Sequence, residues 1–385
     1  MTSSARMRDI RPFYVMELMK KAHQLEAAGA SVIHLEVGEP DFPTAEPIVA
    51  AAQNFLSHGH VHYTPSLGIP ELRRALADFY RTRYQLDVDP ETIVITAGAS
   101  AALLITLGAL VNPGDEWLMP DPSYPCNRNF ARLFDGKVIP IPVDAASNFQ
   151  PSAADIARYW SPATRGLMVA SPSNPTGTIL SQSQIAALWQ EVSDRSGHLV
   201  VDEIYHGLTY GVDLASALAI SKDIFVINSF SKYFGMTGWR LGWMIVPETH
   251  LRDVEKLAQN LFICPSTIAQ HAALAAFAPE TLEILEKRRA IFSHRRNVLV
   301  GGLRALGFEI ATEPQGAFYI YADCSRFTDN SAEFADKLLM EAGVATTAGN
   351  DFGTNRASTH MRFAYTSDVA KLEEALSRIK RFLGQ

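Results

Sequence analysis

A lysine flanked by small hydroxyl residues is the part of this sequence best suited to covalent chemistry. Ser229, Ser231 and Lys232 follow the apolar run 224–227, and Arg240 lies a short distance beyond them. At the end of a buried strand, a lysine can serve as an imine-forming amine, and nearby hydroxyls and a guanidinium can hold an anion. The same residues are equally compatible with a solvated turn, so the surrounding chain must decide between the two interpretations.

The elements that would position this lysine follow a repeating pattern. Apolar runs at 167–170, 199–201 and 224–227 are each followed by polar residues, among them Asn174, Asp202 and Lys232. The separations of these three residues are close to the length of one βαβ unit. Continuously apolar strands are typical of parallel sheets covered on both faces, and polar residues after such strands gather at the edge where ligands bind.

The rest of the chain completes an α/β prediction: a mostly parallel sheet between layers of helices, with a smaller α+β domain. Further strands are predicted at 32–35, 93–95, 116–119, 138–143, 241–246, 308–311, 317–321 and 360–363. Helices are predicted at 13–28, 45–57, from Pro70, at 101–110, roughly 249–305 and 368–382. We assign residues 46–284 to the large domain, and residues 1–45 with 285–385 to the small one.

Composition narrows the class of protein. The 385 residues are 47% apolar and 19% charged, which excludes a disordered chain and favours two domains. A net charge of −7 argues against a nucleic-acid surface, and no segment reaches the apolar length of a membrane helix. The three cysteines fit neither a disulfide framework nor a zinc motif, and the N-terminus lacks a signal-peptide pattern. We therefore expect a cytoplasmic protein.

Six separated motifs carry a family resemblance. They are GEPDF at 38–42, YTPSLG at 63–68, DPSY at 121–124, SPSNPTG at 171–177, DEIY at 202–205, and SFSK at 229–232 with WR at 239–240. In this order, over nearly the whole chain, they resemble the class I and II aminotransferases. These are fold-type I pyridoxal-phosphate enzymes of the aspartate aminotransferase superfamily.

The resemblance implies pyridoxal 5′-phosphate as cofactor and a role for the residues around its ring. Lys232 would form an imine with the cofactor aldehyde and then move the α-proton as base and acid. Asp202 would pair with the protonated pyridine nitrogen and keep the ring an effective electron sink. Asn174 and Tyr205 would hydrogen-bond the phenolic oxygen, and Tyr124 would stack on the ring.

Two anion sites are also implied. The cofactor phosphate would be held by backbone N–H groups at Gly98, Ala99 and Ser100, by Ser229, Ser231 and Arg240, and by Tyr63 from a neighbouring subunit. The last contact implies a homodimer with shared active sites. Arg362 would grip the substrate carboxylate, with Gly38, Tyr124 and Asn174 beside it, and the small domain would close over the substrate.

The sequence allows more than one substrate class and more than one reaction type. PQGAFY at 314–319 resembles members that use neutral or aromatic amino acids, with a 2-oxo acid such as 2-oxoglutarate as acceptor in a ping-pong cycle. A lyase of the same fold, such as a C–S lyase, would keep Lys232, Asp202 and Arg240. A non-catalytic sensing module is a further alternative, although the lysine is retained.

One histidine run invites a metal interpretation. His58, His60 and His62 would share one face of a strand and could then bind a metal ion. Gly59 makes a regular strand doubtful, and no cysteine or carboxylate lies beside them. We therefore expect no metal site in this protein.

Overall fold

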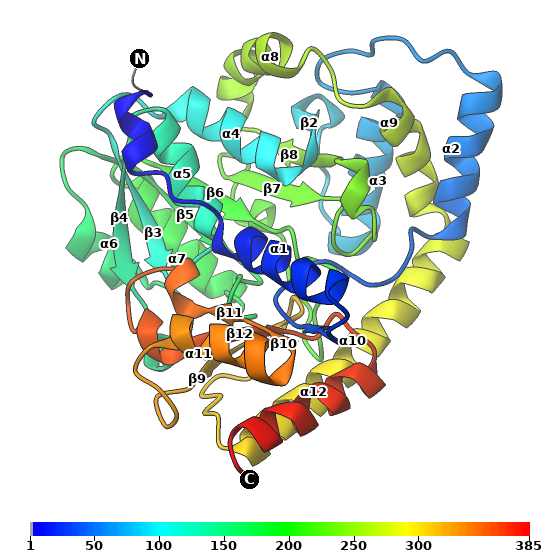
Figure 1. The fold of residues 1–385 in the computed structure, drawn as a ribbon. Helices are drawn as coiled ribbons and strands as arrows, with labels where there is room; N and C mark the ends of the chain where they lie inside the picture. The colour runs from blue at the N-terminus through cyan, green and yellow to red at the C-terminus, as the bar shows by residue number, and fades with distance from the viewer. Residues whose placement is uncertain (1–2) are drawn as a thin grey trace.

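The computed structural model describes residues 3–385 and has a seven-stranded sheet at its centre (Figure 1). The strands lie in the order β2 (Ile93–Thr96), β8 (Gly242–Ile245), β7 (Phe225–Ser229), β6 (His198–Asp202), β5 (Thr164–Ala170), β3 (Glu116–Asp121) and β4 (Lys137–Pro142). All neighbouring pairs from β4 to β7 are parallel, whereas β8 runs antiparallel to both β7 and β2. The predicted α/β class with a mostly parallel sheet is confirmed.

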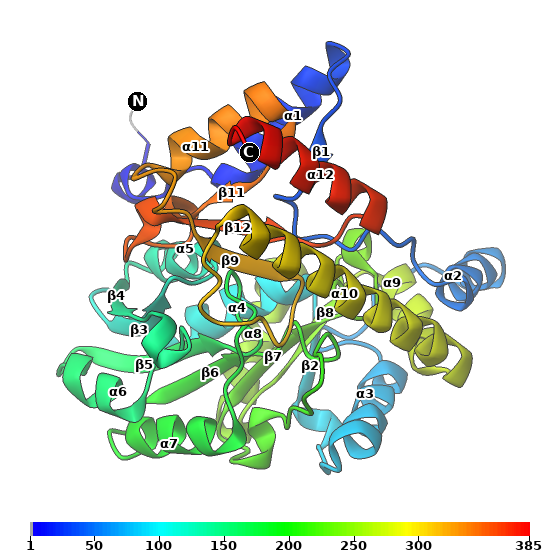
Figure 2. The same ribbon diagram turned by 90° about the horizontal axis from the view of Figure 1, so that it is seen from below.

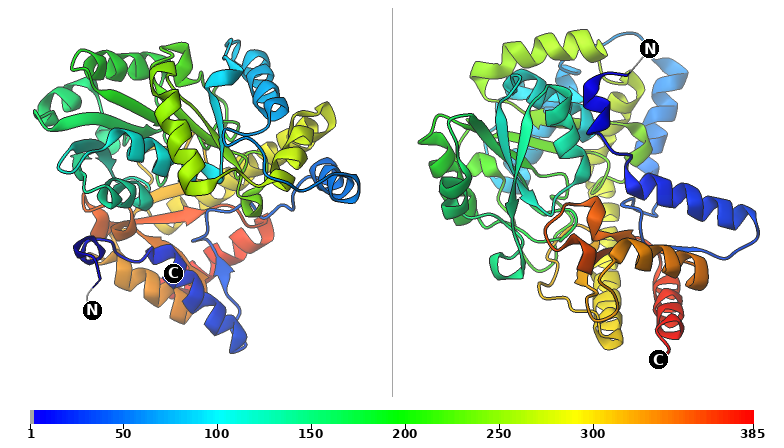
Figure 3. Two further views of the ribbon diagram at one scale, coloured as in Figure 1. Left: turned by 90° about the horizontal axis from the view of Figure 1, so that it is seen from above. Right: turned by 60° about the vertical axis from the view of Figure 1, so that its left-hand side comes forward.

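Both faces of this sheet are buried under helices. Trp117 and Phe225 belong to the core on one face, and the next residues, Leu118 and Val226, belong to the core on the other. This alternation explains why each strand reads as continuously apolar in the sequence. The left panel of Figure 3 shows α8 lying across one face. The covering helices are α4 (Gly98–Leu110), α5 (Pro125–Leu133) and α8 (Glu248–Phe262) on that side, and α3 (Pro70–Tyr84), α6 (Ala153–Tyr159) and α7 (Gln182–Ser193) on the other.

A smaller antiparallel sheet lies beside the large one. Its order is β11 (Thr347–Ala348), β12 (His360–Ala364) and β9 (Tyr319–Asp323). Figure 2 shows it with α1, α11 and α12 gathered on one side of the large sheet. Their bounds are α1 (Tyr14–Ala27), α11 (Ser331–Lys337) and α12 (Val369–Phe382), and the short strands β1 (Ile33–His34) and β10 (Val344–Ala345) pair in parallel nearby.

The long helix α10 (Pro279–Leu306) connects these two regions. Proline at its first position and Gly307 after its end, with φ of +96°, are typical helix boundaries. The predicted helical region 249–305 is in fact divided into α8, α9 (Thr267–Ala273), a 3₁₀ turn (Leu274–Phe277) and α10. Pro265 and Pro279 account for the breaks, because proline cannot continue a preceding helix.

One predicted strand is wrong. Residues 308–311 form only an isolated bridge, in which Glu309 and Asp323 exchange two backbone hydrogen bonds. Phe308 and Ile310 are buried in the core, and this alternating burial produced the strand pattern without a ladder. The helix predicted from residue 101 begins at Gly98, and α2 (Glu46–His58) agrees with its prediction to within one residue. Within residues 3–385, no helix is long and apolar enough to cross a membrane.

Candidate active site

A cavity of about 250 Å³ lies at the carboxyl ends of β5, β6 and β7. It is lined by most of the predicted site residues: Gly38, Ala99, Ser100, Tyr124, Asn174, Asp202, Tyr205, Ser229, Ser231, Lys232, Arg240 and Arg362. Gly98 and Tyr63 are not among the residues that line it. Side chains predicted from separate strand ends therefore meet in one place, as expected of parallel strands.

The amine of Lys232 lies inside this cavity. Its Nζ donates a hydrogen bond to the Gly38 carbonyl oxygen, 2.6 Å away. Burial lowers the pKa of Lys232 to about 8; Glu39 opposes this shift, and the positive charges of Arg362 and Arg240 reinforce it. A lysine with this pKa is partly neutral near pH 7–8, and only the neutral amine can act as a nucleophile or a base.

Asp202 ends β6 and contributes the buried anion of the cavity. The backbone N–H of Ile204 donates to its Oδ1 at 3.0 Å. Burial raises the pKa of Asp202 to about 7, while this hydrogen bond and the charge of Lys232 act in the opposite direction. A buried carboxylate with so few partners is stabilised by any cation that enters the cavity.

A pair of tyrosines forms one wall. The hydroxyl groups of Tyr205 and Tyr319 lie 2.9 Å apart, and burial raises the pKa of both. Tyr319 was not predicted as a site residue, because it lies within an apolar stretch that reads as core. A Cβ on Gly38 would lie 1.9 Å from the Tyr319 hydroxyl, so glycine is required for this close approach.

Arg362, on β12, is 2% exposed and surrounded by neutral groups. Its Nη1 donates to Oδ1 of Asn174 at 2.9 Å, and its Nη2 donates to the Glu36 carbonyl oxygen. Its guanidinium lies 4.2 Å from the ring centre of Tyr319 and 4.8 Å from that of Phe352. Among the described residues its Nε has no hydrogen-bond partner. A buried cation with neutral partners is well placed to receive a carboxylate.

The opposite end of the cavity has the features of an anion site. Gly98 begins α4 with φ of +77°, and a Cβ there would lie 2.7 Å from Nη2 of Arg240. The first turn of α4 has no acidic residue, so its backbone N–H groups remain available to an anion. The hydroxyls of Ser229 and Ser231 are 2.9 Å apart beside it. These groups fit the phosphate of pyridoxal phosphate, and Asp202 and Lys232 fit its ring and aldehyde.

An apolar wall completes the cavity. It comes from the N-terminal segment and the start of α1: Phe13, Val15, Met16 and Met19. The sequence predicted this helix at 13–28 without assigning its apolar residues to the site. Helical spacing identifies a buried face without indicating whether that face meets a core or a ligand cavity.

Tyr63 is the predicted residue that stays outside the cavity of its own chain. Its side chain is 81% exposed. A large aromatic side chain with this exposure is available to another subunit. Its contact with a neighbouring active site stays a prediction.

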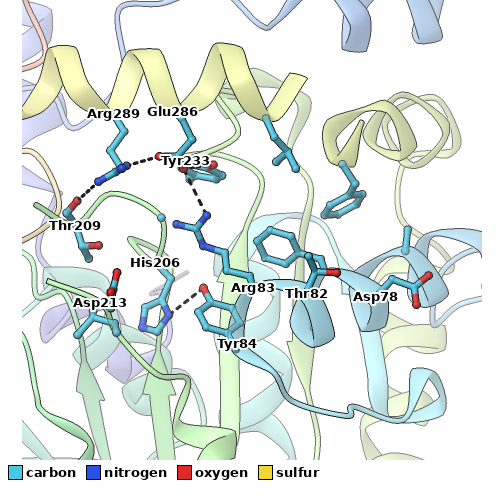
Figure 4. Close-up of a pocket in the computed structure, with 16 residues that line it drawn as sticks. Asp78, Thr82, Arg83, Tyr84, His206, Thr209, Asp213, Tyr233, Glu286 and Arg289 are labelled. Carbon is cyan, nitrogen blue, oxygen red and sulfur yellow. Dashed lines mark hydrogen bonds and ion pairs between the residues drawn. The ribbon is translucent and has the colours of Figure 1, made fainter. Parts of the chain in front are cut away.

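A second, larger cavity of about 900 Å³ is lined by α3, by α10 and by the segments that follow β6 and β7 (Figure 4). Glu286 of α10 accepts hydrogen bonds from Tyr233 at 2.7 Å and from Arg289 at 2.6 Å, and Arg83 lies 3.4 Å from it. Lys232 and Tyr233 thus line different cavities, although they are neighbours in the chain. This second cavity contains none of the predicted site residues.

Comparisons with known proteins agree with this geometry. The family model for aminotransferase class I and II matches residues 30–379. A valine–pyruvate aminotransferase of Mycobacterium tuberculosis is 39% identical over 97% of both chains, and an aspartate/prephenate aminotransferase of Thermus thermophilus is 34% identical over 99% of both. A crystal structure of an aminotransferase from Mycobacterium tuberculosis has a TM-score of 0.97 at 38% identity, covering 100% of this chain and 99% of that one. The chain therefore belongs to the class I and II aminotransferases, whose members use pyridoxal phosphate.

Proposed function

We propose that this aminotransferase takes its amino group from a neutral, apolar or aromatic amino acid and passes it to a 2-oxo acid in a ping-pong cycle. The single observation that carries this proposal is the lining of the cavity. Its lysine and arginine side chains are Lys232, Arg240 and Arg362. The family resemblance assigns each of them to the cofactor or to the α-carboxylate. A side-chain carboxylate would therefore meet the apolar wall of α1 without a partner, at a cost of a few kcal/mol.

The proposed chemistry divides among three residues of the chain. Bound pyridoxal phosphate supplies an electron sink for the carbanion that forms when an amino acid loses its α-proton. Lys232 removes that proton and returns it, Asp202 keeps a positive charge on the ring nitrogen, and Arg362 holds the substrate carboxylate. The cavity between these groups aligns the α-proton with the amine.

The acceptor follows from the same argument. The family resemblance predicts 2-oxoglutarate, which carries a second carboxylate. Pyruvate carries only one, and the Mycobacterium tuberculosis relative is named as a valine–pyruvate aminotransferase. Both acceptors therefore belong in any assay, and the apolar wall favours pyruvate.

Assembly and closure are part of the proposal. Two chains would share their sites through Tyr63, and residues 1–45 with 285–385 would move as a small domain that encloses the substrate. This movement is supported by the position of Arg362 on β12, since a substrate held by Arg362 would connect both sheets. Closure would exclude water from the reacting atoms.

A panel of donors and acceptors tests the proposal. Valine, leucine, phenylalanine and aspartate are each combined with pyruvate or 2-oxoglutarate, glutamate is combined with pyruvate only, and the new amino acid is quantified. We expect kcat/KM for the neutral donors to exceed that for aspartate by at least roughly 10-fold, from the cost of an unpaired carboxylate. Faster reaction with aspartate would contradict it, and release of pyruvate and ammonia from a single substrate would support the lyase alternative.

A further inference from the structure

A cluster of metal-ligating side chains lies at the carboxyl-terminal half of α1 and on β1. His23 and Glu26 are three residues apart on α1, and His34 lies on β1. One ligand atom from each of the three lies within 4.8 Å of the others, and no other such group of three occurs among the described residues. The oxygen Oε1 of Glu26 is 3.2 Å from Nε2 of His34.

A buried glutamate, Glu36, orients the His34 ring of this cluster. Glu36 is fully buried, and its Oε1 lies 2.7 Å from Nδ1 of His34. Its other oxygen, Oε2, is buried and has no hydrogen-bond partner among residues 3–385. Because a carboxylate only accepts hydrogen bonds, Nδ1 of His34 donates to Glu36 and Nε2 donates to Glu26, and a metal ion would replace the proton on Nε2. Histidines that bind metals are oriented by carboxylates in the same way.

We propose that His23, Glu26 and His34 bind one divalent transition-metal ion of the Zn²⁺ type, with Glu36 holding His34 in place. Two imidazoles and one carboxylate suit zinc and its neighbours better than Ca²⁺ or Mg²⁺, which prefer oxygen ligands. With zinc–ligand bonds of about 2.0–2.1 Å, tetrahedral ligand atoms lie roughly 3.3 Å apart, close to the observed Glu26–His34 separation. His23 and Glu26 are exposed, which leaves the fourth position to water.

This ion would connect two elements that both reach the active site. The carbonyl oxygen of Glu36 accepts a hydrogen bond from Arg362, and α1 supplies Met16 and Met19 to the cavity wall. Binding would fix α1 to β1 and restrain that wall. The proposal concerns metal binding itself and does not depend on the identity of the amino acid substrate.

The run of three histidines considered in the sequence is a poorer candidate. His58 ends α2 and its ring contacts the Asn54 carbonyl oxygen, whereas the rings of His60 and His62 stack 5.7 Å apart. No carboxylate joins these residues in a group of three among the described residues. They nevertheless supply the matched control.

The test is calorimetric titration of ZnCl₂ into metal-free holoenzyme, together with the thermal midpoint of unfolding. We expect one ion per chain and a rise in the midpoint with zinc. His23→Ala and Glu26→Gln, both at exposed positions, should weaken binding by at least the roughly 10-fold that loss of an orienting partner costs, and should remove the zinc-dependent rise. The double variant His60→Ala/His62→Ala should bind zinc like the wild type.

Two outcomes would overturn the proposal. One is zinc affinity unchanged in His23→Ala while the cofactor absorbance and circular dichroism show a folded protein. The other is loss of binding in His60→Ala/His62→Ala alone, which would assign the ion to that loop. Cu²⁺ paramagnetic resonance adds an independent measurement, because hyperfine coupling to two imidazole nitrogens should decrease to one in His23→Ala.

Discussion

Nη1 of Arg362 donates to Oδ1 of Asn174 across 2.9 Å, and this bond joins the three-stranded sheet to the turn that follows β5 of the seven-stranded sheet. The two residues are 188 positions apart in the chain. Asn174 is also the residue predicted to contact the cofactor ring. The proposed substrate clamp and the proposed cofactor site are therefore in direct contact through these two side chains.

Removal of the Arg362 guanidinium should weaken binding of the transition state for every amino acid donor. Arg362→Leu should reduce kcat/KM by about 2 kcal/mol, or roughly 30-fold, the size of a charged hydrogen bond. Arg362→Lys keeps the charge without the bidentate fork and should recover part of the loss. Steady-state kinetics with two donors of different size measure this effect. An unchanged KM in Arg362→Leu would place the carboxylate site elsewhere.

A methyl group at Gly38 should obstruct the active site. Because its Cβ would overlap the Tyr319 hydroxyl, Gly38→Ala must displace a side chain that is bonded to Tyr205. Overpacking of this kind costs about 1–3 kcal/mol, so we expect kcat/KM to fall roughly 5- to 150-fold. Gly301→Ala on α10, where a Cβ meets nothing within 4 Å, is the control and should keep full activity.

The pKa of Lys232 predicts how fast the cofactor-free protein takes up pyridoxal phosphate. Only the neutral amine attacks an aldehyde, and burial lowers the pKa of Lys232 to about 8 from its ordinary 10.5. The rate of covalent attachment, followed by stopped-flow absorbance, should rise with pH and level off above about pH 8. A rate still rising steeply between pH 9 and pH 10 would contradict a lowered pKa. Lys232→Ala should show no covalent attachment and no transamination.

Glu203, buried next to Asp202, should make stability depend on pH. Its Oε1 accepts from the Ala217 N–H at 2.6 Å and from the Ser216 hydroxyl at 3.0 Å, and burial raises its pKa to about 8 from 4.5. The pKa of Glu203 is higher in the folded than in the unfolded protein, so the fold favours the protonated carboxyl. The contribution of this protonated carboxyl to stability is complete below about pH 4.5 and is lost as the pH rises to about 8.

Glu203→Gln removes that titration and keeps the acceptor oxygen. The free energy of urea unfolding of the variant, relative to wild type, should increase by on the order of 3 kcal/mol between pH 5 and pH 8. Glu71→Gln, at an exposed glutamate of α3, is the matched control. A difference between Glu203→Gln and wild type that does not change with pH would show that Glu203 is already ionised when buried.

Shared active sites predict complementation between two inactive chains. A site would take Lys232 from one chain and Tyr63 from the other. Tyr63→Leu homodimers should bind the cofactor weakly, and Lys232→Ala homodimers should be inactive. Mixed dimers formed by refolding the two variants together should regain one intact site per dimer. Activity no higher than the mean of the two homodimers would place Tyr63 in its own chain's site, or in none.

Residues that follow successive strands were predictable because parallel strands align their carboxyl ends. Asn174, Asp202 and Lys232 follow apolar strands at βαβ spacing, and parallel strands align such residues at one edge of a sheet. The order of residues alone therefore predicts the α/β class and a polar site at the carboxyl edge of the sheet. The assignment of that site to pyridoxal phosphate comes from the family resemblance.

Contacts between distant segments were decided by tertiary packing. No local pattern indicates that Met16 and Met19 of α1 border a cavity rather than the core, or that Tyr319 lies against Gly38. The approach of His34 to His23 likewise depends on how β1 lies beside α1. An amphipathic helix or an apolar strand buries its face against whatever surface the completed fold presents, so its sequence specifies burial but not the partner.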